Sequence, residues 1–175
     1  MDEKIKYIGN DFFVDDFMDS RLGEITSIEW SVAPYAMAVF FDYSNEWESG
    51  PERSIPIYRG GVFFESPLSA VVPKIEPSNA SIVVGLPFMT MWSEPYQYNN
   101  EDYTSYNFEC DHNDGKFETL QIVSCKAFCF TSRVPFYSKR DSTYVDDLTE
   151  RMNFVHNNAS NLDFFNAYMS ISDLW

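Results

Sequence analysis

The feature of this sequence that most constrains its fold lies between residues 24 and 138, where segments rich in Val, Ile, Phe, Tyr and Trp alternate with turn residues. β-Branched and aromatic residues favour strands, whereas Gly, Pro and Asn favour the turns between them. Residues 24–32 and 35–43 form the first predicted pair of strands. Residues 103–111 and 116–130 form the clearest predicted hairpin, because the Asn-Asp-Gly sequence between them suits a turn with positive φ. The pattern predicts an antiparallel sheet.

The rest of this region alternates between strand and loop signals. Residues 55–58 and 62–65 are predicted to be short strands that flank a hairpin turn at two consecutive glycines. Residues 81–92 form an almost continuous apolar run, which is typical of a buried strand. Residues 93–102, with the sequence SEPYQYNNED, are polar and are predicted to form a loop.

Helical patterns are confined to the two ends of the chain. Residues 10–20 predict an N-terminal helix, because apolar residues recur on one side and aspartates on the other. Residues 142–172 predict C-terminal helices, the last of which begins with Ser160 and Asp163 in the spacing of a capping box. We therefore expect a single α+β domain, residues 1–175, with an antiparallel β-sheet core and short helices at the N- and C-termini.

Composition limits the function classes that this chain can belong to. Its 175 residues include 27 acidic and 12 basic residues, for a formal net charge of -15, and 18% are aromatic. A hydrophobic content of 45% excludes a disordered acidic tail. The lack of a basic excess excludes a nucleic-acid-binding protein and a polybasic membrane anchor. The first residues carry both signs of charge with no apolar run after them, so we expect no secretory signal and a cytoplasmic location.

The acidic residues are unevenly distributed along the chain. Residues 1–50 contain eleven acidic and three basic residues, and residues 101–175 contain twelve and six. Residues 51–100 contain four acidic and three basic residues, so this section is close to neutral. The distribution predicts a discrete acidic face on a packed domain, rather than an acidic surface that imitates a whole nucleic-acid duplex.

Four residues are a weak candidate for a metal site: Cys110, His112, Cys125 and Cys129. Their types suit zinc, but in a strand Cys125 and Cys129 would lie ~13 Å apart, whereas zinc needs sulfur ligands within about 4 Å of each other. We therefore expect no metal and no cofactor. The sequence contains none of the common nucleophile, phosphate-binding or metallohydrolase motifs and only two histidines, which favours a protein with no catalytic residues.

Two groups of residues are predicted to bind a partner. The first lies on the predicted N-terminal helix, where carboxylates four residues apart form a stripe beside an apolar anchor: Asp11, Phe12, Asp15, Asp16 and Asp19. The second combines aromatic and acidic residues of two predicted loops: Trp47, Glu48, Tyr96, Tyr98, Glu101, Asp102 and Tyr103. Tyrosine and tryptophan with small polar neighbours are typical of loops that bind proteins.

Together these features predict a non-catalytic acidic binding protein. We expect an inhibitor, or an immunity or anti-defence protein, that occupies the basic, nucleic-acid-binding face of another protein or of a nucleoprotein complex. It would bind neither nucleic acid nor a membrane directly. Two alternatives stay open. One is a carbohydrate or small-molecule pocket lined by Tyr, Trp and carboxylates, with or without hydrolase activity. The other is a structural subunit of a larger assembly. The sequence leaves the oligomeric state open.

Overall fold

Antiparallel strands make up most of the chain in a computed structural model, which describes residues 3–14, 23–32, 35–44, 50, 54–73, 86–111, 116–138 and 159–172. Of these residues, 69% are in strands and 13% are helical. The predicted α+β class with short helices at both termini is therefore wrong. The chain is mostly β, and its described residues contain one α-helix, near the C-terminus. No helix in the described ranges has both the length and the apolar composition needed to span a bilayer.

The strands pair in one continuous sheet. Within the described residues they are β1 (Ile5–Gly9), β2 (Gly23–Val32), β3 (Tyr35–Ser44), β4 (Ile55–Glu65), β5 (Ser69–Val71), β6 (Leu86–Tyr98), β7 (Glu101–Asp111), β8 (Phe117–Ser124), β9 (Lys126–Ser132) and β10 (Phe136–Ser138). Their order is β1-β9-β4-β3-β2-β6-β7-β8-β5, and β10 pairs with β4. The pairing predicted for residues 24–32 and 35–43 is confirmed by β2 and β3. The hairpin predicted for residues 103–111 and 116–130 is confirmed by β7 and β8, up to a bend at Cys125.

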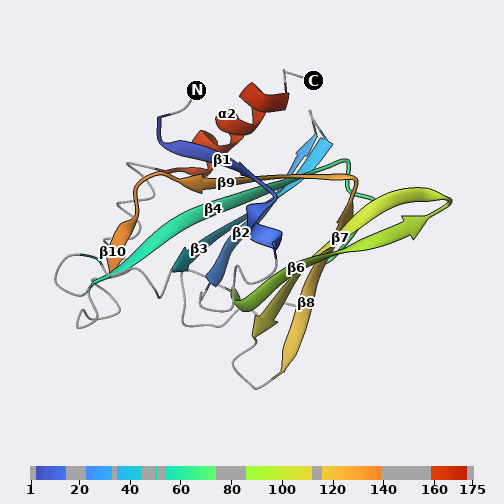
Figure 1. Ribbon diagram of the computed structural model, residues 1–175, viewed down its shortest axis with the longest axis horizontal. Coiled ribbons are helices and arrows are strands. Elements are labelled where there is room, and N and C mark those ends of the chain that lie inside the picture. The colour runs from blue at the N-terminus through green and yellow to red at the C-terminus, as the bar shows by residue number, and fades with distance from the viewer. Residues whose placement is uncertain are drawn as a thin grey trace.

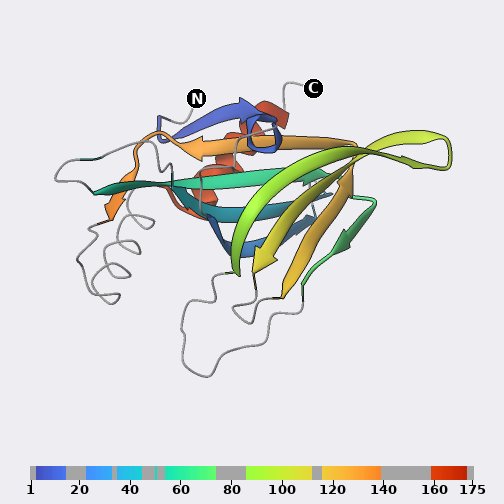
Figure 2. The same ribbon diagram turned by 60° about the horizontal axis from the view of Figure 1, so that its bottom comes forward.

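The sheet folds over into two facing layers, because the chain bends between β4 and β5 and also between β8 and β9, which lie beside them (Figures 1 and 2). β4 pairs with β9 in one layer, and the chain then continues into β5, which pairs with β8 in the other layer. At this corner the Ser124 hydroxyl donates a hydrogen bond to the Glu65 carbonyl at 2.7 Å. On the opposite side, a short pairing between β2 and β6 joins the layers. One layer is β1-β9-β4-β3-β2 and the other is β6-β7-β8-β5.

The space between the layers is filled with aromatic rings. Phe41 of β3 contacts Phe88 of β6 edge-to-face at 5.5 Å, and Phe88 contacts Phe108 of β7 at 5.6 Å. All three side chains are almost completely buried. The turn predicted between residues 55–58 and 62–65 is wrong, because β4 continues through both glycines. A Cβ at Gly60 would lie 2.5 Å from the Phe41 ring, so the glycine serves packing rather than turning.

One layer is also covered on its outer face, by the helix α2 (Asn161–Ser172). Tyr168 of α2 stacks on Phe63 of β4 with ring centroids 4.5 Å apart. The predicted capping box at the start of α2 is confirmed, because the backbone amide of Ser160 donates to Asp163 Oδ2 at 2.8 Å and the Ser160 hydroxyl does so at 2.9 Å. Residues 142–158 of the predicted C-terminal helices lie outside the described residues.

The predicted N-terminal helix over residues 10–20 is wrong in its described part. The chain forms one turn of 3-10 helix, η1 (Asp11–Phe13), and Val14 is already extended, with ψ 143°. The reason is the burial of two consecutive rings. Phe12 contacts Phe41 and Tyr43, whereas Phe13 contacts Tyr106 and Phe108 across the interior. The 3-10 turn thus directs the two rings to different parts of the same core.

Candidate functional site: a projecting tyrosine and carboxylate arm

The predicted loop at residues 93–102 is wrong, because these residues extend β6 and β7 into a long hairpin. The hairpin turns at Asn99 and Asn100, whose φ angles are 51° and 64°. Two consecutive residues with positive φ match the twist of a hairpin, and Asn tolerates this conformation better than most residues. Residues 93–102 are all exposed. Residues 93–104, here called the arm, project from the body of the protein in both ribbon views (Figures 1 and 2).

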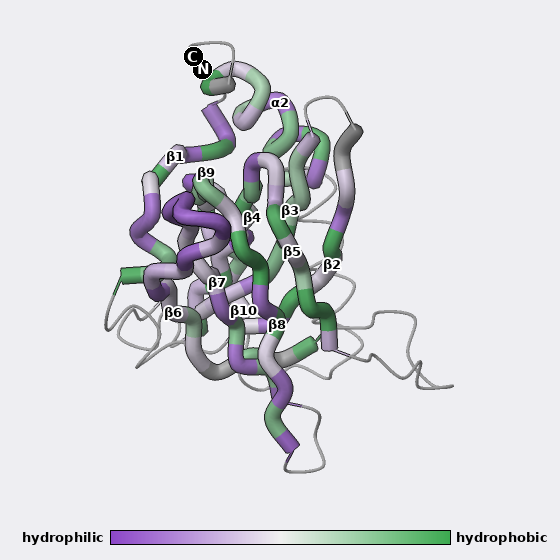
Figure 3. Tube along the Cα trace, turned by 90° about the vertical axis from the view of Figure 1, so that its right-hand side faces the viewer, coloured by the Kyte–Doolittle hydropathy of each residue, from purple (hydrophilic) through white to green (hydrophobic). Residues whose placement is uncertain are grey.

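The two faces of the arm carry different side chains, because alternate residues of a strand point to opposite faces. Tyr96 pairs with Tyr103, and Tyr98 pairs with Glu101. Paired residues share a face, which we call the tyrosine face; it consists of Glu94, Tyr96, Tyr98, Glu101 and Tyr103. The opposite face carries the Gln97–Asp102 pair. Figure 3 looks at the molecule from the side of the arm and shows hydrophilic residues at its end.

Hydrogen bonds fix side chains on both faces of the arm. The Tyr103 hydroxyl donates to Glu101 Oε2 at 2.8 Å, and this bond raises the pKa of Tyr103. On the other face, Gln97 Nε2 donates to Asp102 Oδ1 at 3.0 Å. Each carboxylate keeps further lone pairs for a partner, because an ionised carboxylate accepts about four hydrogen bonds.

The base of the arm is held rigidly on both faces. On the inner face Tyr106 packs against Phe13 and Phe64 in the core. On the outer face Ser105 and Asn107 are 1% exposed, and Gln121 Nε2 of β8 donates to Ser105 Oγ at 3.1 Å. An exposed ribbon therefore starts from a packed and hydrogen-bonded base, which limits the conformational entropy that binding would cost.

The structure brings together five residues of the second predicted group and, in the first, buries Phe12 while Asp11 stays exposed. The members of the second group on the arm lie within one hairpin: Tyr96, Tyr98, Glu101, Asp102 and Tyr103. Asp102 lies on the face opposite the tyrosines. Of the first group, Asp11 is exposed but Phe12 is 0% exposed in the core, so its predicted role as an exposed anchor is wrong. The remaining predicted residues lie outside the described residues: Asp15, Asp16, Asp19, Trp47 and Glu48.

Sequence reasoning missed Glu94 as a member of this site. Its signal was present in the chain, because Glu94, Tyr96 and Tyr98 follow each other at intervals of two, which is the period of a strand. The Asn99–Asn100 pair, which suits a two-residue hairpin turn, completed that signal.

A second exposed group, the corner patch, consists of Trp30 and Tyr35. Trp30 and Tyr35 are 54% and 51% exposed, and their rings stack with centroids 6.2 Å apart. The backbone amide of Ser66 donates to the Tyr35 carbonyl at 3.0 Å, so Tyr35 lies next to the bend between β4 and β5. The sequence predicts strand positions for Trp30 and Tyr35 and gives no sign of their exposure.

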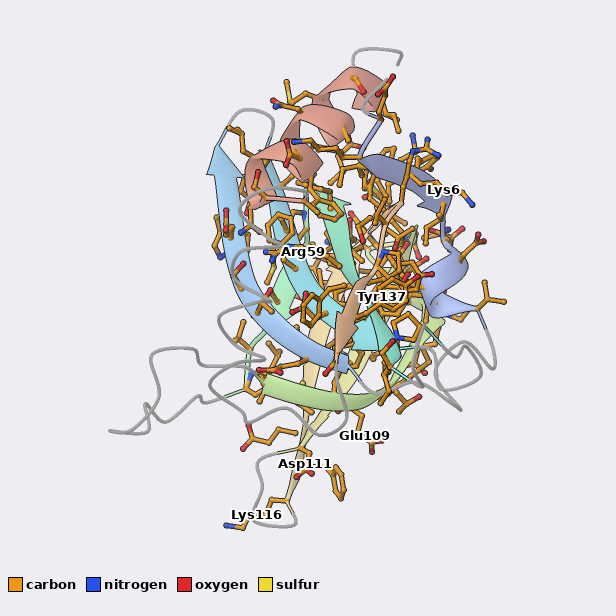
Figure 4. All side chains as sticks on the ribbon, turned by 90° about the vertical axis from the view of Figure 1, so that its left-hand side faces the viewer. Lys6, Arg59, Glu109, Asp111, Lys116 and Tyr137 are labelled. Carbon is orange, nitrogen blue, oxygen red and sulfur yellow. The ribbon has the colours of Figure 1, made fainter. Side chains whose placement is uncertain are left out.

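A buried polar group lies beneath the start of α2 and serves the fold. Arg59 of β4 is 6% exposed and donates through Nη2 to Asn161 Oδ1, and Asn161 Nδ2 donates to Glu29 Oε1. Figure 4 shows Arg59 inside the molecule, away from Asp111 and Lys116, which lie at the far end of β7 and β8. Burial lowers the pKa of Arg59, whereas Asp42 and Glu29 act in the opposite direction. These bonds tie the first residue of α2 to two strands.

The fold places the cysteines of the weak metal candidate in two different environments. Cys110 and Cys129 are buried in the core between the layers, and Cys125 is exposed at the corner. Burial raises the pKa of the Cys110 thiol to about 11, and it also raises the pKa of Cys129. His112 lies outside the described residues. Among the residues that are described, no three His, Cys, Asp or Glu side chains are grouped closely enough to hold a metal ion.

Comparisons of this chain with protein-family models, with curated proteins and with solved structures found no match.

Proposed function

We propose that this protein is a non-catalytic acidic binding protein, and that its arm occupies a basic, nucleic-acid-binding face of a partner protein. The observation that supports this function is the projection of tyrosines and carboxylates on an exposed ribbon with a rigid base. An inhibitor or an immunity or anti-defence protein of the cytoplasm would act in this way, by blocking the partner's nucleic-acid site.

The chemistry of the arm suits such a partner. Carboxylates form charge-assisted hydrogen bonds with Arg and Lys. Tyrosines supply contact area at low entropic cost, because their rings have few rotatable bonds. The net charge of -15 favours rapid encounter with basic proteins. A projecting ribbon also fits a concave face, and grooves that hold nucleic acid are concave and basic.

Two observations favour a macromolecular partner over a carbohydrate or small-molecule pocket. Small-molecule sites are concave, whereas the tyrosines lie on a projecting arm. The space between the layers is occupied by the mutually packed rings of Phe41, Phe88 and Phe108.

A shortened arm tests the proposal. Deleting Tyr96, Gln97, Asp102 and Tyr103 removes two residues from each strand, so the remaining side chains keep their faces. The full chain should capture a basic protein from extracts of its source organism at low salt, and added duplex DNA should compete. The shortened variant should not capture that protein.

A matched control separates the arm from total charge. Glu3 is exposed and lies two residues before β1, which is away from the arm in Figure 1. Glu3→Lys reverses one charge and should leave capture nearly unchanged. Equal capture by the full and shortened chains, or capture that duplex DNA does not reduce, would contradict the proposed function.

A role as a subunit of a self-assembly is the second candidate, and the corner patch favours it. Exposed stacked rings such as Trp30 and Tyr35 are enriched at protein interfaces. Sedimentation velocity should then show association that increases with concentration and weakens in Trp30→Ser with Tyr35→Ser. A chain that stays monomeric at the highest concentration measured would exclude this self-assembly.

A further inference from the structure

We infer that the tyrosine face of the arm selects arginine over lysine, so that the partner presents an arginine-rich segment to it. This inference rests on the proposed function, since it specifies which basic side chains the arm recognises. The evidence for it is the arrangement of tyrosine rings and carboxylates on one face of the paired strands β6 and β7.

The tyrosine face consists of three successive rows across the two strands. Glu94 lies in the first row, Tyr96 and Tyr103 are paired in the second, and Tyr98 and Glu101 are paired in the third. Paired residues have Cβ atoms about 5 Å apart, and successive rows on one face are about 7 Å apart. Every ring therefore has a carboxylate in its own row or in the next one.

The rings of this face are available to a partner. Tyr96 and Tyr98 are 39% and 49% exposed. At these exposures, part of each ring surface can receive a planar cation, while the neighbouring carboxylates neutralise its charge.

Guanidinium groups fit this arrangement better than ammonium groups do. The arginine side chain is planar, is weakly hydrated, stacks on aromatic rings and donates two parallel hydrogen bonds to a carboxylate. Lysine offers a compact and strongly hydrated charge, which gains from the carboxylates but less from the rings. Both cations should therefore bind the arm, and arginine should bind more tightly.

Charge also argues against a second copy of this chain as the occupant. A second copy would carry the same net charge of -15 and would bring a second acidic arm to the contact. Like charges placed together across an interface weaken binding. The occupant that complements the face is an arginine-rich segment of a different protein.

Two peptides of equal charge test the inference by isothermal titration calorimetry at low salt. Deca-arginine should bind the full chain roughly three- to tenfold more tightly than deca-lysine, as expected for cation–π contacts at two exposed rings. The double variant Tyr96→Leu and Tyr98→Leu removes both exposed rings, keeps every carboxylate and leaves the Tyr103–Glu101 hydrogen bond in place. It should bind both peptides with nearly equal affinity, mainly through a weaker affinity for deca-arginine.

The outcomes separate this inference from the proposed function. Equal affinities for the two peptides, both lost in the shortened arm, would overturn arginine selection and leave the arm as a basic-partner site. Unchanged binding of both peptides by the shortened arm would overturn the proposed function itself. Circular dichroism melting of each variant identifies one that fails to fold. In that case the single variant Tyr98→Leu, near the exposed turn, should narrow the difference between the two affinities, and an unchanged difference would overturn arginine selection.

Discussion

At the scale of single residues, surface and core are one residue apart at Asp11 and Phe12. The aspartates around Phe12 favour an exposed anchor on a surface helix. In the structure Phe12 is 0% exposed and makes edge-to-face contacts with Phe41 and Tyr43. The carboxylate next to it stays in solvent, so a single 3-10 turn separates a charged surface position from a core position.

The stability of two point variants should show this difference. Phe12→Ala should lower the free energy of unfolding by about 3–5 kcal/mol, because it leaves a cavity among buried rings. Val14→Ala, two residues further on, removes a side chain that is 54% exposed and should change stability by less than about 0.5 kcal/mol. Urea unfolding of the two variants checks this prediction, and similar small effects would contradict the burial of Phe12.

The three cysteines should differ in reactivity because their environments differ. The thiolate is the reactive form, and burial raises the pKa of Cys110 to about 11 and also raises that of Cys129. Cys125 is exposed. With Ellman's reagent near pH 8, the native chain should react rapidly at one thiol, and the unfolded chain at all three. Cys125→Ser should abolish the rapid phase. Rapid reaction at a second thiol would contradict the burial of Cys110 and Cys129.

At the scale of elements, local patterns predicted pairing where the turn chemistry was decisive. The β2–β3 and β7–β8 pairs and the capping box of α2 follow from neighbouring residues. The polar composition of residues 93–102 favours a loop, because a strand that is exposed on both faces has no buried apolar side to mark it. Gly60 and Gly61 favour a turn in the sequence because their packing partners, Phe41 and Phe164, are distant in it. Long-range packing decides the conformation at the glycines, and local signals do not contain it.

The capping box makes the stability of α2 depend on pH. Burial acts to raise the pKa of Asp163, but hydrogen bonds from Ser160 and the ion pair with Lys4 outweigh it, so the pKa lies below the ordinary value. A lower pKa in the folded state stabilises the fold above about pH 4, and this contribution is lost as pH falls through the folded value. Asp163→Asn should cost about 1 kcal/mol near neutral pH.

Urea unfolding across a pH series measures this contribution. The difference between the native chain and Asp163→Asn should shrink as pH falls below about 4, because the native carboxyl then becomes neutral as well. Ser160→Ala removes the hydroxyl donor and should cost about 1 kcal/mol near neutral pH. A pH-independent difference for Asp163→Asn would show that the carboxylate charge does not contribute.

At the scale of the whole molecule, charge and packing oppose each other. With a net charge of -15, acidic residues repel one another in the folded state, whereas the burial of aromatic rings between the layers stabilises it. The same charge is what the proposed function uses to attract a basic partner. Salt screens both effects, since the Debye length is about 10 Å at 0.1 M. Added salt should therefore stabilise the fold while it weakens binding through the arm.

Neutralising the arm separates these two roles. Glu94→Gln, Glu101→Gln and Asp102→Asn together remove three negative charges from exposed positions and keep hydrogen-bond acceptors for Tyr103 and Gln97. At low salt this triple variant should be slightly more stable than the native chain, by up to about 0.5 kcal/mol, because repulsion falls. Its gain in stability on adding NaCl should be smaller than that of the native chain, and its affinity for deca-arginine should fall. Loss of stability at low salt would mean that the arm carboxylates hold the hairpin together, whereas a stable variant that no longer binds assigns them to the partner.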